Sequence, residues 1–151
     1  KSCLKQMIDQ YDGRGCMVAV EEIEGEEISN YGVLDVDYNE GDKIKIKGLV
    51  EKPNYNQAPS KYAVVGRYIL TPRIFEYLNK QIKGTGDEIQ LTDALSWTAK
   101  HEDCFGLKIE GERFDCGSKI GYLRANIAFA IGRDDLSAEV LEYLGTFTKN
   151  E

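Results

Sequence analysis

Residues 31–51, YGVLDVDYNEGDKIKIKGLVE, decide the expected fold. In residues 31–38 acidic side chains alternate with apolar ones, and in residues 43–50 lysines alternate with isoleucines. A period of two is typical of strands that bury one face. Residues 39–42 form a turn in which Gly41 can adopt a left-handed conformation. The stretch therefore predicts a β-hairpin.

Further elements are expected on both sides of this hairpin. Strands are predicted at residues 17–23 and 104–109, with residues 113–116 extended. Residues 62–70 form an apolar run broken only by Gly66 and Arg67, which is typical of a strand buried on both faces. Caps and helical spacing predict helices over residues 3–11, from Thr71-Pro72 to 82, from an Asp87 N-cap to 98, from Ser118 to 131 and from Ser137 to 144.

The order of these elements indicates an α/β fold, a mixed sheet with flanking helices, in a single domain over residues 1–151. No Gly-rich loop of the kind that cradles phosphate follows a strand. The chain also begins with Lys1 inside an expected helix, which we interpret as truncation.

Composition narrows the class of partner. Nineteen basic and 26 acidic residues give a net charge of −7, which argues against binding to nucleic acid or to an anionic membrane. No segment approaches the about 20 apolar residues of a membrane span, and no signal pattern opens the chain, so we expect a cytoplasmic protein. The four cysteines form no C-x-x-C pair and accompany one histidine, so reduced thiols are expected rather than a zinc site.

The tripeptide Glu51-Lys52-Pro53 ends a strand, because proline donates no ladder hydrogen bond and favours an extended residue before it. Where the pleat is abandoned, Glu51 and Lys52 can face one ligand. The carboxylate would accept hydrogen bonds from sugar hydroxyls and the ammonium would contact a phosphate. The alternative is a solvated ion pair at a strand end.

Gly32 and Gly66 lie inside expected strands, where glycine often marks the close approach of a ligand. A bulge or a tight crossing is the alternative for each. Asp115 precedes Gly117 and is a candidate magnesium ligand, or else a turn former ahead of the next helix. Glu88 would reach a sugar hydroxyl or favour the dipole of its helix.

Taken together and in order, these segments resemble the bacterial UTP-glucose-1-phosphate uridylyltransferases. The resemblance runs through most of the chain and is carried by residues 18–22 (VAVEE), 31–33 (YGV), 50–53 (VEKP), 58–60 (APS), 64–70 (VVGRYIL), 86–93 (GDEIQLTD) and 115–117 (DCG).

The resemblance implies the C-terminal part of a Rossmann-like nucleotidyltransferase fold. It also implies roles for the candidate residues, with Lys52 and Asp115 as the catalytic pair. Gly32 would lie beside the sugar, Glu51 would hold its hydroxyls, Lys52 would contact the phosphate, Val65 and Gly66 would line the sugar pocket, and Asp115 would bind Mg²⁺.

The implied partners are glucose 1-phosphate, UTP and UDP-glucose. The nucleotide loop, the uracil-recognition segment and the first magnesium aspartate of the family would all precede Lys1, so we expect this chain alone to be inactive. The missing strands would leave an open sheet edge, which predicts a homo-oligomer. The alternatives are another sugar-1-phosphate nucleotidylyltransferase, or a non-catalytic module that assembles through its last helices.

Overall fold

The computed structural model describes residues 1–148. The chain divides into two compact units, residues 1–111 and the residues from 112 onward, and each is described by itself. The expectation of a single domain stays a prediction, because a compact unit need not be a region that folds independently.

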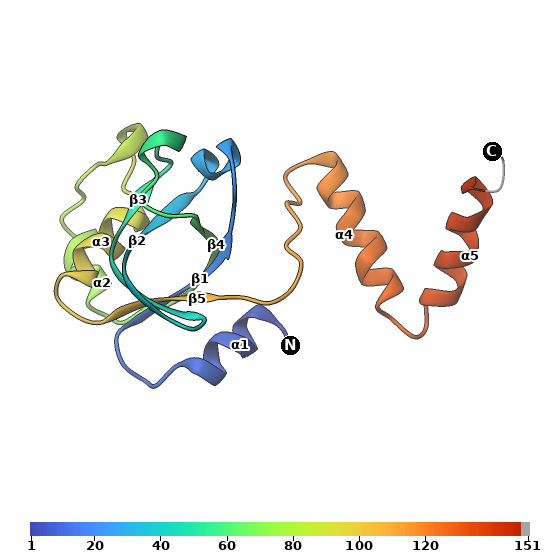
Figure 1. The fold of residues 1–151 in the computed structure, drawn as a ribbon, viewed down its shortest axis with the longest axis horizontal. Coiled ribbons are helices and arrows are strands. Elements are labelled where there is room, and N and C mark those ends of the chain that lie inside the picture. Colours follow the sequence, from blue (N-terminus) through green and yellow to red (C-terminus); the bar gives the residue numbers. More distant parts are fainter. Residues whose placement is uncertain (149–151) are drawn as a thin grey trace. The chain divides into compact units, whose positions relative to one another are not determined.

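The first unit is built on a mixed sheet. Its strands follow the order β1-β4-β2-β3-β5, and the last strand pairs again with the first, so that the sheet closes into a barrel (Figure 1). The β1–β5 pairing is parallel and the others are antiparallel. The predicted fold class, a mixed α/β sheet with flanking helices, is confirmed. The strands are β1 Cys16–Glu22, β2 Gly32–Glu40, β3 Lys43–Glu51, β4 Tyr62–Ile69 and β5 Cys104–Lys108.

The prediction of an open sheet edge is wrong for residues 1–148. The short strand β5 pairs with β1 along Cys16–Val20 and with the start of β3 at Lys43, Ile44 and Lys45, and so joins what would have been two edges. Tertiary pairing between segments far apart in the sequence decides this closure.

The predicted hairpin is confirmed. The β2 and β3 strands pair as far as Glu40 and Lys43, which leaves Gly41 and Asp42 as the turn. Gly41 has a φ of 63°, a left-handed value that glycine adopts without a steric penalty.

Strand β4 is present, but it is not buried on both faces as predicted. Only Ala63 in it is fully buried. The pairing with β1 shifts from Val18↔Tyr68 to Val20↔Val64, so residues 65–67 lie opposite the single residue Ala19. This bulge lifts Gly66 and Arg67 into solvent, which explains the error.

Three helices accompany the barrel: α1 Cys3–Gln10, α2 Ile74–Leu78 and α3 Leu91–Ala99. Thr71 and Pro72 form a turn ahead of α2 rather than its cap, and α2 ends well before Ile82. Asp87 does not cap α3 as predicted: it ends the short 3₁₀ helix η3 Thr85–Asp87 with a φ of 61°, and Gln90 is the N-cap. Short 3₁₀ helices also occur as η1 Glu26–Asn30 and η2 Tyr55–Gln57.

Apolar side chains on the two faces of β1 enter two separate cores. Alternate residues Cys16, Val18 and Val20 belong to the main cluster, which also takes in the buried faces of β2, β3, α2 and α3. Met17 and Ala19 point the other way and pack with Met7 and Leu107, so that α1 covers this outer face. The alternation of a strand therefore places helices on both sides of β1.

The second unit consists of α4 Lys119–Ile131 and α5 Ser137–Thr148. The predicted Ser118 cap is confirmed, because its hydroxyl accepts a hydrogen bond from the Gly121 N–H at 3.0 Å. Ser137 is the first residue of α5 rather than its cap. Of the helices in residues 1–148, none has both the length and the apolar character that crossing a membrane requires.

Candidate functional site

Three residues lie together at the end of strand β3: Glu51 and Thr92, which have polar side chains, and Gly32, which has none. Glu51 is the last residue of β3, and its Oε2 accepts a hydrogen bond of 2.5 Å from the Thr92 hydroxyl in the first turn of α3. Gly32, the first residue of β2, is the register partner of Glu51. Residues directly opposite each other share one face of a sheet, so the Glu51 carboxylate lies beside the backbone of Gly32, which has no side chain.

The space at Gly32 is small and bounded by functional groups. A Cβ built there would lie 3.3 Å from Glu51 Oε2 and 3.5 Å from Thr92 Cγ2. A side chain at this position would therefore press on both the carboxylate and the threonine. The groups that approach Gly32 closely are the protein's own Glu51 and Thr92 side chains, and the predicted approach of a ligand stays a prediction.

The chain leaves strand β3 at Lys52, as predicted, but the backbone conformation of Lys52 is not the predicted one. Its N–H still donates to the Tyr31 carbonyl at 3.1 Å, which extends the ladder by one residue. Its φ is 44°, a left-handed value, and not the extended value that the following Pro53 favours. Pro53 is buried, and the chain turns sharply to place it there. The Lys52 side chain remains exposed next to Glu51.

Gly66 and Val65 lie in the β4 bulge. Gly66 has a φ of 80°, and a Cβ built there would meet no atom within 4 Å. The glycine is therefore required by its backbone conformation, so the structure supports the bulge at this position rather than close approach by another group. The Val65 side chain packs against the cluster beneath α1. Only the backbone of these two residues is left to contact a ligand.

Tyr68, two residues after Gly66, belongs to the surroundings of Glu51 although the sequence analysis missed it. Its ring packs against the main core. Burial and then the nearby charge of Glu51 raise the pKa of the Tyr68 phenol. Tyr68 and Thr92 lie within the motifs at residues 64–70 and 86–93, but the sequence analysis predicted no site role for either residue.

Glu88 lies in the exposed segment that leads into α3. Its carbonyl accepts from the Gly84 N–H at 2.8 Å, and its carboxylate is 3.4 Å from the Gln90 amide nitrogen. The side chain thus interacts with its own segment. Its predicted contact with a sugar hydroxyl stays a prediction.

Asp115 belongs to the second unit and shapes the turn before α4. Its Oδ1 accepts from the Gly117 N–H at 2.9 Å, and its carbonyl accepts from Ser118. No group of three or more His, Cys, Asp or Glu side chains that could hold a metal ion occurs within residues 1–148. A single exposed carboxylate fits one ligand of a magnesium ion whose other ligands are phosphate oxygens and water, and not a complete protein site.

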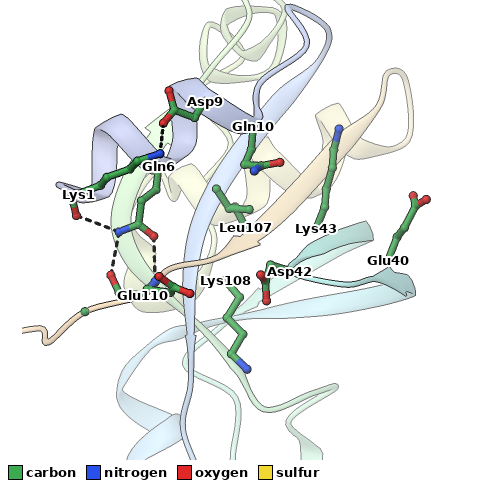
Figure 2. A pocket seen from close by; sticks show the side chains of 11 residues that line it. Lys1, Gln6, Asp9, Gln10, Glu40, Asp42, Lys43, Leu107, Lys108 and Glu110 are labelled. Carbon is green, nitrogen blue, oxygen red and sulfur yellow. Dashed lines mark hydrogen bonds and ion pairs between the residues drawn. The ribbon is translucent and has the colours of Figure 1, made fainter.

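A cavity of about 650 Å³ lies at the opposite end of β3, between α1, Lys43 and the end of β5. Figure 2 shows the Gln6 side chain directed at the backbone of Glu110, to which it donates at 2.8 Å and from which it accepts at 3.0 Å. Three lysines and four carboxylates line the cavity, so its charges nearly balance, and Lys1 pairs with Asp9 at 2.9 Å. The cavity is therefore a mixed, largely neutralised surface, separate from the group at Glu51.

Comparison with known proteins agrees with the resemblance in the motifs. The family model described as "Nucleotidyl transferase" matches residues 1–130. The chain is 47% identical over 121 residues to a UTP-glucose-1-phosphate uridylyltransferase of Komagataeibacter xylinus, a match that covers 80% of this chain and 43% of that protein. The resemblance predicted from the sequence is confirmed.

Solved structures give the same result. A UDP-glucose pyrophosphorylase in complex with UDP-glucose is 43% identical, with a TM-score of 0.75, over 86% of this chain and 48% of that one. The UTP-bound enzyme of Acinetobacter baumannii is 33% identical, with a TM-score of 0.80, over 93% of this chain and 49% of that one. The chain spans about half the length of the relatives that it matches. Because the family model covers most of its residues, the chain belongs to the nucleotidyl transferase family.

Proposed function

We propose that this chain is the sugar-phosphate-binding part of an enzyme that transfers the uridylyl group of UTP to glucose 1-phosphate. The observation that carries the proposal is the group at the end of β3, where the Glu51 carboxylate, the bare backbone of Gly32 and the Lys52 ammonium lie on adjacent or paired residues. The names of the relatives support the choice of substrate.

Each residue of this group suits one part of a phosphorylated hexose. A carboxylate accepts hydrogen bonds from neighbouring hydroxyls, and the register partner of Glu51, Gly32, places no side chain beside it. The exposed Lys52 ammonium provides a point charge for the phosphate. The backbone of Val65 and Gly66 and the Glu88 carboxylate are further proposed contacts.

In the proposed reaction a phosphate oxygen of glucose 1-phosphate attacks the α-phosphorus of UTP. The new oxygen–phosphorus bond forms UDP-glucose, and the bond from the α-phosphorus to the bridging oxygen breaks, so that pyrophosphate leaves. The protein's part is alignment and neutralisation of charge, not a covalent step. Lys52 would hold the attacking phosphate in line.

Asp115 is the proposed magnesium ligand of this chain. When bound, Mg²⁺ would neutralise phosphate charge. The paramagnetic ion Mn²⁺ is a suitable probe. With UDP-glucose present, Mn²⁺ should broaden the Gly117 amide resonance, and Asp115→Asn should abolish the broadening. Equal broadening in both proteins would remove Asp115 from the site.

A titration of the ¹⁵N-labelled chain tests sugar-phosphate binding. Glucose 1-phosphate should produce saturable shifts of the Gly32, Lys52 and Gly66 amides. Glu51→Gln should weaken this binding about tenfold or more, because hydrogen bonds to a charged group are lost. Inorganic phosphate, which carries no sugar hydroxyls for Glu51, should bind weakly and equally to both proteins.

Glu26→Gln is the matched control, since Glu26 is an exposed glutamate on η1 and should not alter binding. Absence of saturable shifts in the wild-type chain, together with a stable dimer by light scattering, would favour the assembly module instead. Catalytic inactivity of the chain alone, homo-oligomerisation and a cytoplasmic location are further parts of this proposal.

A further inference from the structure

The Thr92 hydroxyl donates its hydrogen bond to an acceptor that is unusual for its position in a helix. It is the second residue of α3, where a threonine hydroxyl commonly bonds to nearby backbone. Here the hydroxyl instead donates to Glu51 Oε2 across the gap between helix and strand, at 2.5 Å. The N-cap Gln90 makes no side-chain capping bond either. The first turn of α3 thus directs its hydroxyl at the carboxylate.

The contact is aligned by a second hydroxyl on the same helix face. Ser96, four residues after Thr92, bonds to both main-chain groups of Leu49, which precedes Glu51 by two residues. Four helical residues rise about 6 Å and two strand residues about 6.6 Å, so the two spacings match. Ser96 fixes α3 on β3, and Thr92 then falls opposite Glu51.

We propose that Thr92 is a positioning residue, which holds the Glu51 carboxylate in the rotamer that receives two adjacent hydroxyls of the sugar. The proposal rests on the function proposed above and names the means by which that site is preorganised. A carboxylate offers about four acceptor positions, and Thr92 occupies one of them on Oε2. Oε1 and the second position of Oε2 are left for the ligand.

The surroundings support this role. The methyl group of Thr92 closes the side of the Gly32 space, at 3.5 Å from a Cβ built there. A flexible glutamate loses rotamer freedom when it binds a ligand, and a bond already formed in the free protein removes part of that loss. Thr92 should therefore increase affinity without touching the sugar.

The first test needs no ligand. Three-bond couplings and side-chain ¹³C shifts report the rotamer of Glu51 in the wild-type chain, Thr92→Val and Thr92→Ser. We expect one rotamer in the wild type and in Thr92→Ser, which keeps the hydroxyl, and averaging in Thr92→Val, which keeps the shape. A single unchanged rotamer in Thr92→Val would overturn the proposal. Thr92→Ala is the second variant should Thr92→Val fail to fold.

The second test is a double-mutant cycle on the affinity for glucose 1-phosphate. Thr92→Val should weaken binding about tenfold, and Thr92→Ser by no more than about twofold. In a Glu51→Ala background Thr92→Val should have no further effect, because its partner is gone. Full weakening in that background would show that Thr92 acts on its own, and would overturn the proposal.

The two tests separate this proposal from the proposed function. A wild-type chain that does not bind glucose 1-phosphate counts against the function alone. The rotamer of Glu51 then still decides whether Thr92 orders the carboxylate.

Discussion

The hydroxyl of Ser96 in α3 bonds to both main-chain groups of Leu49 in β3, accepting from its N–H and donating to its carbonyl at 2.6 Å each. On the other side of the pair Leu34↔Leu49, the Ser60 hydroxyl donates to the Leu34 carbonyl at 2.7 Å. Strand β5 pairs with β3 only over residues 43–45. At Leu49, beyond that pairing, the Ser96 side chain of α3 makes the main-chain hydrogen bonds that a neighbouring strand would otherwise make.

Replacing Ser96 with alanine should lower the free energy of unfolding by about 1–3 kcal/mol, because the buried N–H and carbonyl of Leu49 would lose their partner. Chemical denaturation measures the change. Ser137→Ala, at the first residue of α5, is the matched control and should have a clearly smaller effect. Equal losses in the two variants would contradict this account of Ser96.

Lys52 should show a conflict between stability and binding. Its φ of 44° is unfavourable for a residue with a side chain, so Lys52→Gly should raise the free energy of unfolding by about 1 kcal/mol. The same change removes the ammonium and should weaken glucose 1-phosphate binding. Lys52→Asn, which tolerates a left-handed backbone, should have an intermediate stability.

The matched control for Lys52 is Lys47→Gly, at an exposed lysine inside β3. Glycine weakens an extended strand, so this variant should lose stability. A loss of stability in Lys52→Gly as well would show that the left-handed conformation stores no strain.

Gly32→Ala should weaken the binding of glucose 1-phosphate without changing the stability of the fold. The added Cβ would lie 3.3 Å from Glu51 Oε2, which must shift by a few tenths of an ångström. We expect a several-fold weaker affinity for glucose 1-phosphate and little change in the unfolding midpoint. A wild-type affinity, measured by the same amide titration, would contradict a role for the absence of a side chain at Gly32.

The ion pairs of Glu22 should make stability depend on pH. Its carboxylate lies 2.7 Å from the Lys61 ammonium and 2.9 Å from that of Lys108, and hydrogen bonds from these two lysines lower the Glu22 pKa. A lowered carboxyl pKa stabilises the fold above the unfolded value of 4.5, and this contribution disappears as the pH falls through the folded value.

Glu22→Gln should therefore have a lower thermal midpoint than the wild type at pH 7, and the difference should shrink as the pH falls below 4.5 and through the lowered folded pKa, and also in high salt. Thermal unfolding across this pH range measures it. Glu26→Gln should match the wild type at each pH. A difference that persists in acid would assign the effect of Glu22 to packing.

Local patterns predicted the parts of the site that lie on one strand. The turn at Gly41 and the end of β3 at Glu51 followed from alternation and from proline chemistry, and both are confirmed. The predictions of an N-cap at Asp87 and of an extended backbone at Lys52 were wrong. In both cases neighbouring backbone contacts overrode the intrinsic preference of the residue.

By itself the sequence determined the strands, most of the helices and the family, because periodicity and short motifs depend only on residues close together in the chain. Only the tertiary structure decided that β5 closes the sheet and that Thr92 reaches Glu51. These contacts join residues distant in the chain, and their geometry depends on the register of β3 against both β5 and α3. No local pattern contains that register, since it is set by packing of the whole unit.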